Sequence, residues 1–250
     1  IKTMLAPLEV WASRWKTNGF IKKAKAIQDK IDTSKDYSIE EAIELLKSAP
    51  KAKFNESVDL SVNLGIDATK SDQGVRGSST LPHGIGKNMT VVAFADGEDE
   101  KAAKDAGADE VGFEDLIDKV KKEKDLVADI VVATPECMKK MGQLGRILGP
   151  KNLMPNPKEG TVTKNIAEAI TKAKKGQIRY KNDKAGIIHA IIGKLDFDTN
   201  KLADNAAALV SDLIKAKPSS AKGKYMKNIT ISSTMGPGIR VDLSSVEKRS

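Results

Sequence analysis

Basic side chains occur in three short clusters, each beside an expected strand near one end of the chain. Lys and Arg neutralise phosphates, and an aromatic ring such as that of Phe54 packs on a sugar or a base. The clusters are Lys51 and Lys53; Arg179, Lys181 and Lys184; and Lys222, Lys224 and Lys227. If they converge, they form an RNA-binding surface. Taken singly, each is typical of a solvated strand, and Phe54 of a core residue.

The net charge favours the same class of ligand. The formal net charge is +8, and residues 84–175 contain equal numbers of basic and acidic residues, so the whole surplus lies in residues 1–83 and 176–250. Such a surplus binds polyanions through the release of counterions. Plain solubility is the alternative explanation. A polyanion-binding face would therefore be formed by the two ends of the chain together.

The stretch 142–160 is a second candidate contact. It reads GQLGRILGPKNLMPNPKEG, in which glycines and prolines fix the backbone while Arg146, Lys151 and Lys158 supply charge. Long loops without secondary structure are commonly functional, and backbone amides beside basic side chains hold phosphates or a partner surface. A crossover that only covers the end of a sheet is the alternative.

Catalytic and metal-binding chemistry lacks a persuasive pattern. One cysteine, Cys137, and two histidines, His83 and His189, provide neither an intramolecular disulfide nor a Cys/His zinc site, and a buried thiol is favoured over a reactive one. Gly84 and Gly86 precede a strand, whereas the glycines of nucleotide-binding loops follow a strand and open a helix. We therefore expect no enzyme activity, no cofactor and no metal, with a nucleotide-dependent enzyme as the alternative.

Length and hydropathy predict a protein without a membrane partner. The 250 residues suffice for one large domain or two of ordinary size. The apolar runs at 90–95 and 187–193 are far shorter than the roughly 20 residues of a membrane span. In residues 1–20, treated as an extension, Leu8, Trp11 and Trp15 recur at the spacing of a short amphipathic helix.

The outer parts of the chain predict an α+β unit. Ser38 and Glu41 form a capping box that starts a helix ending near Lys47. Strict alternation of apolar and polar residues over 57–66 predicts a strand with one buried face. After residue 176, further elements are expected. These are two strands paired through a turn, 177–181 and 186–192; a helix, 198–215; and two strands, 225–234 and 239–243.

The middle of the chain predicts a parallel sheet, because apolar strands alternate there with helices. The strands are 89–95, 108–113 and 129–134, and the helices are 98–106, 114–124, 135–141 and 162–175. This segment, 84–175, would be a domain inserted into an outer domain made of 1–83 and 176–250. The two crossings are expected to form a hinge. They contain Pro82, His83 and Gly84, and Lys175 and Gly176.

Four strings together resemble one known family. They are SVDLSVNLGIDATKSDQGVRGSSTLPHGIGK (57–87), GQLGRILGPKNLMPNPKEGTV (142–162), RYKNDKAGIIHAIIGK (179–194) and STMGPGIRVD (233–242). In their order and spacing they resemble the large ribosomal subunit protein one family of stalk proteins, in its bacterial form. The resemblance covers about residues 21–243.

The resemblance implies an α/β fold of two domains, an α+β outer domain formed by both chain ends and an inserted Rossmann-like α/β domain. It also implies a set of RNA contacts in the outer domain and a secondary set in the inserted one. The first set is Lys53, Phe54, Ser57, Lys184, Asn228, Thr234, Met235 and Gly236, and the second is Arg146, Gly149, Lys151 and Asn152. A hydroxyl, a flexible apolar side chain and a glycine at 234–236 suit shape recognition of folded RNA.

The function implied by the resemblance is that of a non-enzymatic constituent of the large ribosomal subunit. Such a protein binds stalk ribosomal RNA, assists the release of deacylated tRNA from the exit site and represses translation of its own operon mRNA. We accordingly expect a monomer when free, and a cytoplasmic ribosome in preference to an organellar one.

Overall fold

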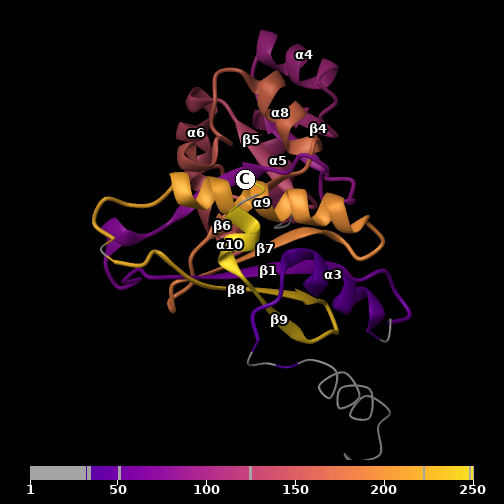
Figure 1. The fold of residues 1–250 in the computed structure, drawn as a ribbon. Coiled ribbons are helices and arrows are strands. Elements are labelled where there is room, and N and C mark those ends of the chain that lie inside the picture. The colour runs from indigo at the N-terminus through magenta and orange to yellow at the C-terminus, as the bar shows by residue number, and fades with distance from the viewer. Residues whose placement is uncertain are drawn as a thin grey trace, which may run out of the picture.

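The computed structural model describes residue 32 and residues 35–49, 52–123, 126–221, 223–247 and 249. The helix expected around Trp11, together with Lys51 and Lys222, lies outside the described residues. Helices and strands are mixed, as an α/β fold requires, in two regions (Figure 1). The described residues within 35–83 and 176–249 form the antiparallel region, and those within 84–175 form the parallel region.

The antiparallel region is built on a four-stranded sheet of order β7-β1-β8-β9. The central strand β1 (Ser57–Leu64) pairs with β7 (Ile187–Lys194) and β8 (Met226–Ser233), and β9 (Gly238–Val241) pairs with β8, all antiparallel. Along β1 every second residue from Val58 is buried, so the alternation that predicted this strand is confirmed.

Three helices cover the buried face of this sheet. They are α3 (Ile39–Ser48), α9 (Thr199–Lys215) and α10 (Leu243–Glu247). The predicted capping box of α3 is present, since the Ser38 hydroxyl accepts a hydrogen bond from the Glu41 amide and the Glu41 carboxylate accepts one from the Ser38 amide. Apolar residues from all three helices and from the sheet share one core, so the sheet is held as a firm platform.

A separate two-stranded sheet corrects one prediction. The strand β6 (Gln177–Lys181) pairs with β2 (Arg76–Thr80) and not, as expected, with β7. The turn that follows β6 is linked to β7 by the isolated bridge from Asn182 to Ile188. The sequence RGSST of β2 lacks apolar alternation, so it was not predicted as a strand. A short 3₁₀ helix, η1 (Ser71–Gln73), precedes it.

The parallel region has three strands in the order β4-β3-β5. They are β3 (Val91–Phe94), β4 (Glu110–Gly112) and β5 (Ile130–Ala133). One face of the sheet packs on α4 (Glu98–Asp105) and α8 (Ile166–Lys174), and the other on α5 (Glu114–Glu123) and α6 (Pro135–Met141). Strands covered on both faces read as continuous apolar runs, which is the pattern seen in the sequence.

The stretch 142–160 is more structured than predicted. It contains η2 (Gly142–Leu144), α7 (Gly145–Leu148) and η3 (Pro157–Glu159). Leu144 and Leu148 are buried, and this anchors the short turns on the parallel region. The following helix, α8, begins later than expected, because Val162 forms a parallel bridge with Ala133 and so extends the sheet.

The two crossings between the regions lie side by side. Gly84 has a φ of 66° and Gly176 a φ of 97°, both in the left-handed range that favours glycine. A Cβ built on Gly176 would come within 2.5 Å of the Gly84 Cα, so the backbones touch where side chains could not fit. The carbonyl of Gly176 also accepts a hydrogen bond from the Leu81 amide.

Polar contacts join the two regions beyond the crossings. Glu159 is buried, and its carboxylate accepts a hydrogen bond from the Arg76 guanidinium of β2. The guanidinium of Arg179 on β6 donates to the Asn152 carbonyl at 3.0 Å and to the Asp129 carbonyl at 2.8 Å. The antiparallel and parallel regions are therefore held together by arginines that meet a buried carboxylate and backbone carbonyls.

Candidate nucleic-acid interface

Ser57 and Thr234 adjoin each other at one end of the four-stranded sheet. The Thr234 amide donates to the Ser57 carbonyl at 3.1 Å, and the Ser57 amide donates to the Thr234 Oγ1 at 3.0 Å. These bonds carry the β1 to β8 pairing one step beyond β8. The Thr234 hydroxyl, expected to face RNA, thus already holds the start of β1.

Two large apolar side chains protrude close to this end of the sheet. Phe54 is 55 % exposed and Met235 is 47 % exposed. Phe54 precedes β1 and Met235 follows β8, and Val58 lies opposite Ser233 in the register of these strands. The alternative that Phe54 is a core residue is therefore wrong. Exposed apolar side chains of this size indicate an interaction surface when they gather in one place.

A buried carboxylate, that of Glu56, lies between the segments that hold these two side chains. One oxygen accepts a hydrogen bond from the Ala52 amide at 2.9 Å. The other accepts bonds from the Ser233 hydroxyl at 2.7 Å and the Met235 amide at 3.1 Å. Burial acts to raise the pKa of Glu56, but the three hydrogen bonds outweigh it and lower the pKa below 4.5. The group is ionised at neutral pH.

Basic groups stand at the same end of the sheet. Lys194, the last residue of β7, donates from Nζ to the Ser57 hydroxyl at 2.9 Å. Lys53 is exposed beside Phe54. Together with Gly236, the residues expected here form one group of six. This group, called the loop group below, contains Lys53, Phe54, Ser57, Thr234, Met235 and Gly236.

The remaining two expected contacts, Asn228 and Lys184, lie at the opposite end of β1. Asn228 on β8 stands opposite Asn63, and Lys184 is exposed in the turn that leads into β7. At about 3.4 Å per residue, the six-residue step from Ser57 to Asn63 spans roughly 20 Å. The structure therefore brings six of the eight positions together and sets two apart.

The three basic clusters are divided in the same way. Lys53 belongs to the loop group, whereas Lys224 and Lys227 enter β8 from the end that holds Lys184. Arg179 turns toward the parallel region and bonds the Asn152 carbonyl. The described members of the three clusters therefore do not meet at one point, since Lys53 and Lys224 lie at opposite ends of the sheet and Arg179 lies on β6.

The secondary contacts lie in the parallel region, where it meets β6. Arg146 is exposed on α7, and Gly149, Lys151 and Asn152 are exposed in the segment that follows. Asn152 has a φ of 55°, and its carbonyl accepts the Arg179 bond. In this structure the segment is part of the contact between the two regions.

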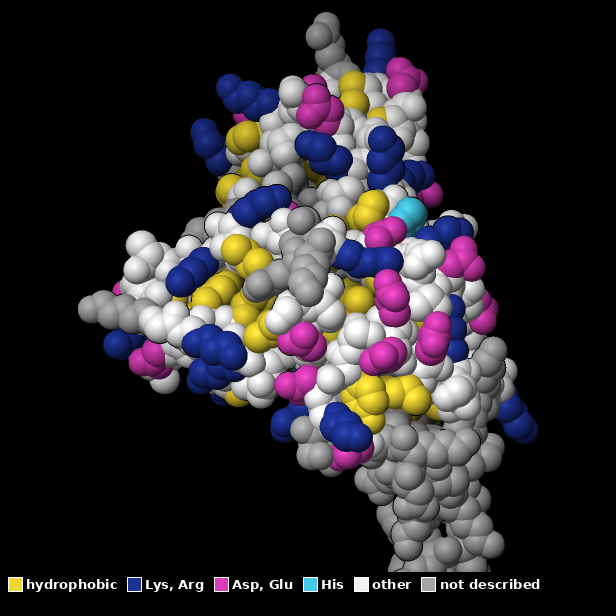
Figure 2. Space-filling model, in the orientation of Figure 1, with side chains coloured by type: hydrophobic (Ala, Val, Ile, Leu, Met, Phe, Trp, Pro, Cys, Tyr) yellow, Lys and Arg dark blue, Asp and Glu magenta, His cyan; other side chains and the backbone are white. Residues whose placement is uncertain are grey.

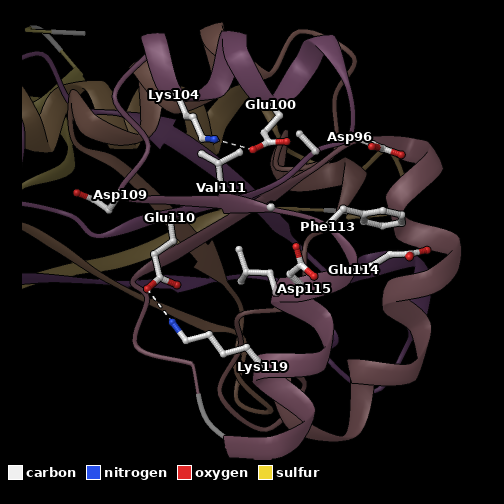
Figure 3. A pocket seen from close by; sticks show the side chains of 13 residues that line it. Asp96, Glu100, Lys104, Asp109, Glu110, Val111, Phe113, Glu114, Asp115 and Lys119 are labelled. Carbon is white, nitrogen blue, oxygen red and sulfur yellow. Dashed lines mark hydrogen bonds and ion pairs between the residues drawn. The ribbon is translucent and has the colours of Figure 1, made fainter.

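The edge of the parallel sheet where nucleotides bind in related folds is acidic here (Figure 3). An open hollow of about 790 Å³ is lined by Asp96, Glu114 and Asp115, among others. Glu100 and Glu110 also line it, paired with Lys104 and Lys119 respectively. Carboxylates at this edge would repel the phosphates of a nucleotide. Their presence therefore argues against the alternative prediction of a nucleotide-dependent enzyme.

Other chemistry finds little support in the described residues. Cys137 is buried, and burial raises the pKa of its thiol, which contradicts a reactive thiolate. Within the described ranges, no three His, Cys, Asp or Glu side chains gather as a metal site would need. None of the helices described is long and apolar enough to cross a membrane.

On the face drawn in Figure 2, basic and acidic side chains are interspersed.

Sequence reasoning missed three residues of the loop group's surroundings, Glu56, Ser233 and Lys194. A signal for two of them was present. Glu56 lies two residues before the buried Val58, and Ser233 lies two residues after the buried Ile231. Residues two apart in a strand share a face, so both side chains point inward at the ends of neighbouring strands. A carboxylate and a hydroxyl on the inner face of paired strands are expected to bond each other.

One comparison with known proteins bears on this arrangement. A family model described as "Ribosomal protein L1p/L10e family" matches residues 45–237. The match includes all of the loop group, Asn228, Lys184 and the whole parallel region.

Proposed function

Because the chain belongs to the ribosomal protein L1p/L10e family, we propose that the loop group binds the stalk ribosomal RNA of the large subunit. Membership itself indicates a ribosomal protein that associates with ribosomal RNA, and proteins of this kind are generally not enzymes. What the proposal adds is the surface, the stalk as the target and the roles that follow from it.

The observation that supports this surface most strongly is the pair of exposed apolar side chains, Phe54 and Met235, on segments bonded to one buried carboxylate. Apolar groups at the rim of a polar site exclude water from the hydrogen bonds inside it, and a hydrogen bond in such surroundings is stronger than one in water. Exposed lysines, in contrast, contribute little sequence preference. The loop group therefore suits recognition of RNA shape.

The spacing of the two groups defines the size of the footprint. Asn228 and Lys184 lie roughly 20 Å along β1 from Ser57. A single folded RNA that contacts both groups has to extend along β1 and β8. Lys184, Lys224 and Lys227 at the far end supply phosphate contacts, which add affinity and fix the RNA's orientation.

Two further roles belong to the proposal. By holding the stalk, the protein assists the release of deacylated tRNA from the exit site. As a free monomer, it represses translation of its own operon by binding an mRNA site that presents the same shape as the stalk. A messenger leader that competes with stalk RNA no better than unrelated RNA would remove the second role.

We also propose that the antiparallel and parallel regions are two domains that open about Pro82 to Gly84 and Lys175 to Gly176. The supporting observations are the two touching glycines at the crossings and the polar contacts that Arg76 and Arg179 make between the regions. Polar contacts between domains allow relative motion more readily than an apolar interface does. RNA binding would then select or accommodate an opening.

The test of the main proposal compares the binding of stalk RNA with that of a length-matched scrambled RNA at two salt concentrations. A Met235→Ala variant is measured beside Ile214→Ala, a matched control because Ile214 is 41 % exposed on α9, a different element. We expect a preference for stalk RNA that persists at higher salt, is reduced in Met235→Ala and is kept in the control. Equal, steeply salt-dependent binding of both RNAs would contradict the proposal.

A further inference from the structure

We infer that Glu56 is a positioning residue for RNA binding, whose buried carboxylate fixes the two segments of the loop group relative to each other. The inference rests on the proposed function, because it assigns to Glu56 the shaping of that surface. Glu56 itself is 3 % exposed and is not expected to touch RNA.

The division of labour between the two carboxylate oxygens supports this role. Oε1 accepts from the Ala52 amide, and this bond closes the segment holding Lys53 and Phe54 into a turn. Oε2 accepts from the Ser233 hydroxyl and the Met235 amide, which set the segment after β8. Both oxygens are needed, one for each segment, so a side chain with a single acceptor oxygen would release one of them.

The electrostatic cost of Glu56 argues against a role in stability alone. A negative charge close to an RNA surface opposes the binding of phosphates, and a buried charge is expensive without good partners. In the described part of the chain, the Glu56 carboxylate bonds to three neutral donors: the Ala52 amide, the Ser233 hydroxyl and the Met235 amide. Charge-assisted bonds to neutral donors hold a backbone in place more strongly than neutral bonds do.

Gly236 lies against the same hydrogen-bonded arrangement around Glu56. A Cβ built on this residue would lie 2.3 Å from the Ser233 Oγ, the atom that donates to Glu56. Any larger residue at 236 would push the Ser233 hydroxyl out of its bond. The glycine in the loop group is thus required by the packing of the free protein, before any close approach of RNA is considered.

The test is a set of binding measurements with stalk and scrambled RNA. Glu56→Gln keeps the shape of the side chain but leaves it one acceptor oxygen. It should lower the affinity for stalk RNA about tenfold, equivalent to about 1.4 kcal/mol. The affinity for scrambled RNA should not change. Ser233→Ala should lower stalk affinity in the wild-type background and have little further effect in Glu56→Gln. Ser211→Ala on α9, outside the proposed RNA footprint, is the control.

A spectroscopic measurement tests whether the Glu56 carboxylate tethers both segments, those of Ala52 and Met235. In the free wild-type protein, the amide proton resonances of Ala52 and Met235 should shift together as pH falls, with one midpoint below 4.5, because both amides donate to the same carboxylate. Unrelated midpoints for the two amides would overturn the tether.

Each binding outcome decides the inference. A folded Glu56→Gln variant with stalk affinity within twofold of wild type overturns it while leaving the proposed function intact. If Glu56→Gln does not fold, Ser233→Ala decides in the same way. A wild-type protein that shows no preference for stalk RNA overturns the proposed function, and the inference with it.

Discussion

Replacing Glu159 by Gln should open the contact between the antiparallel and parallel regions. The Glu159 side chain is 6 % exposed and bonded to Arg76, and the Arg179 guanidinium lies 3.9 Å away. Glutamine has nearly the same shape but no charge. Both arginines would then face a neutral amide in a setting where burial already disfavours the charge of Arg179, whose pKa is lowered.

The size of the effect follows from the exposure of the partners. Breaking a fully buried ion pair costs roughly 3–5 kcal/mol, and an exposed pair is worth at most about 1 kcal/mol. Arg76 is 35 % exposed at its side chain and Arg179 is 21 % exposed, so water screens part of the loss. We expect about 2 kcal/mol, which is a roughly thirtyfold shift toward the open arrangement.

Single-molecule energy transfer between dyes on the two regions measures this shift. Lys101→Cys on α4 and Lys215→Cys at the end of α9 offer exposed labelling sites, and the native Cys137 is buried and protected from the dyes. Glu168→Gln is the control, since it removes an exposed α8 carboxylate that pairs with Lys172 of its own helix. Open populations that differ by less than twofold between Glu159→Gln and wild type would refute the reasoning.

Three further predictions concern the loop group and Glu56, which positions it. Gly236→Ala should lower affinity for stalk RNA about tenfold, whereas Gly142→Ala, where a Cβ meets nothing within 4 Å, should not; equal affinities in a binding titration would contradict this. Because the pKa of Glu56 is lowered on folding, its stabilisation is complete above about pH 4.5 and is lost as pH falls through the lower folded value. Denaturant unfolding between pH 3 and 6 (roughly one and a half units either side of the unfolded value) should show the stability gap between wild type and Glu56→Gln narrowing toward acid. Lys53→Ala should weaken the binding of stalk RNA and of scrambled RNA alike. It should also reduce the slope of log binding constant against log salt concentration by about one, whereas Met235→Ala should leave this slope unchanged.

The sequence predicted best the elements with strong local signals. The capping box at Ser38, the alternation along β1 and the apolar runs of β3 and β5 all gave the correct type of element, because each reflects burial imposed on a regular backbone. Short apolar strands joined by helices likewise indicated the parallel sheet.

Pairing and side-chain contacts were harder to predict. β6 pairs with β2, about a hundred positions earlier in the chain, and the small residues of β2 gave no signal for it. The bond between Ser233 and Glu56 also joins distant parts of the chain. Local patterns show which way a side chain points, but its partner depends on which strands become neighbours.

Crosslinking in assembled large subunits tests the central claim most directly. A photoreactive phenylalanine analogue placed at Phe54 should crosslink to ribosomal RNA within the stalk, because Phe54 is 55 % exposed in the loop group. The same analogue at Ile214, exposed on α9 away from this group, should give no stalk crosslink. Crosslinks from position 214 to the stalk, with none from position 54, would contradict the account.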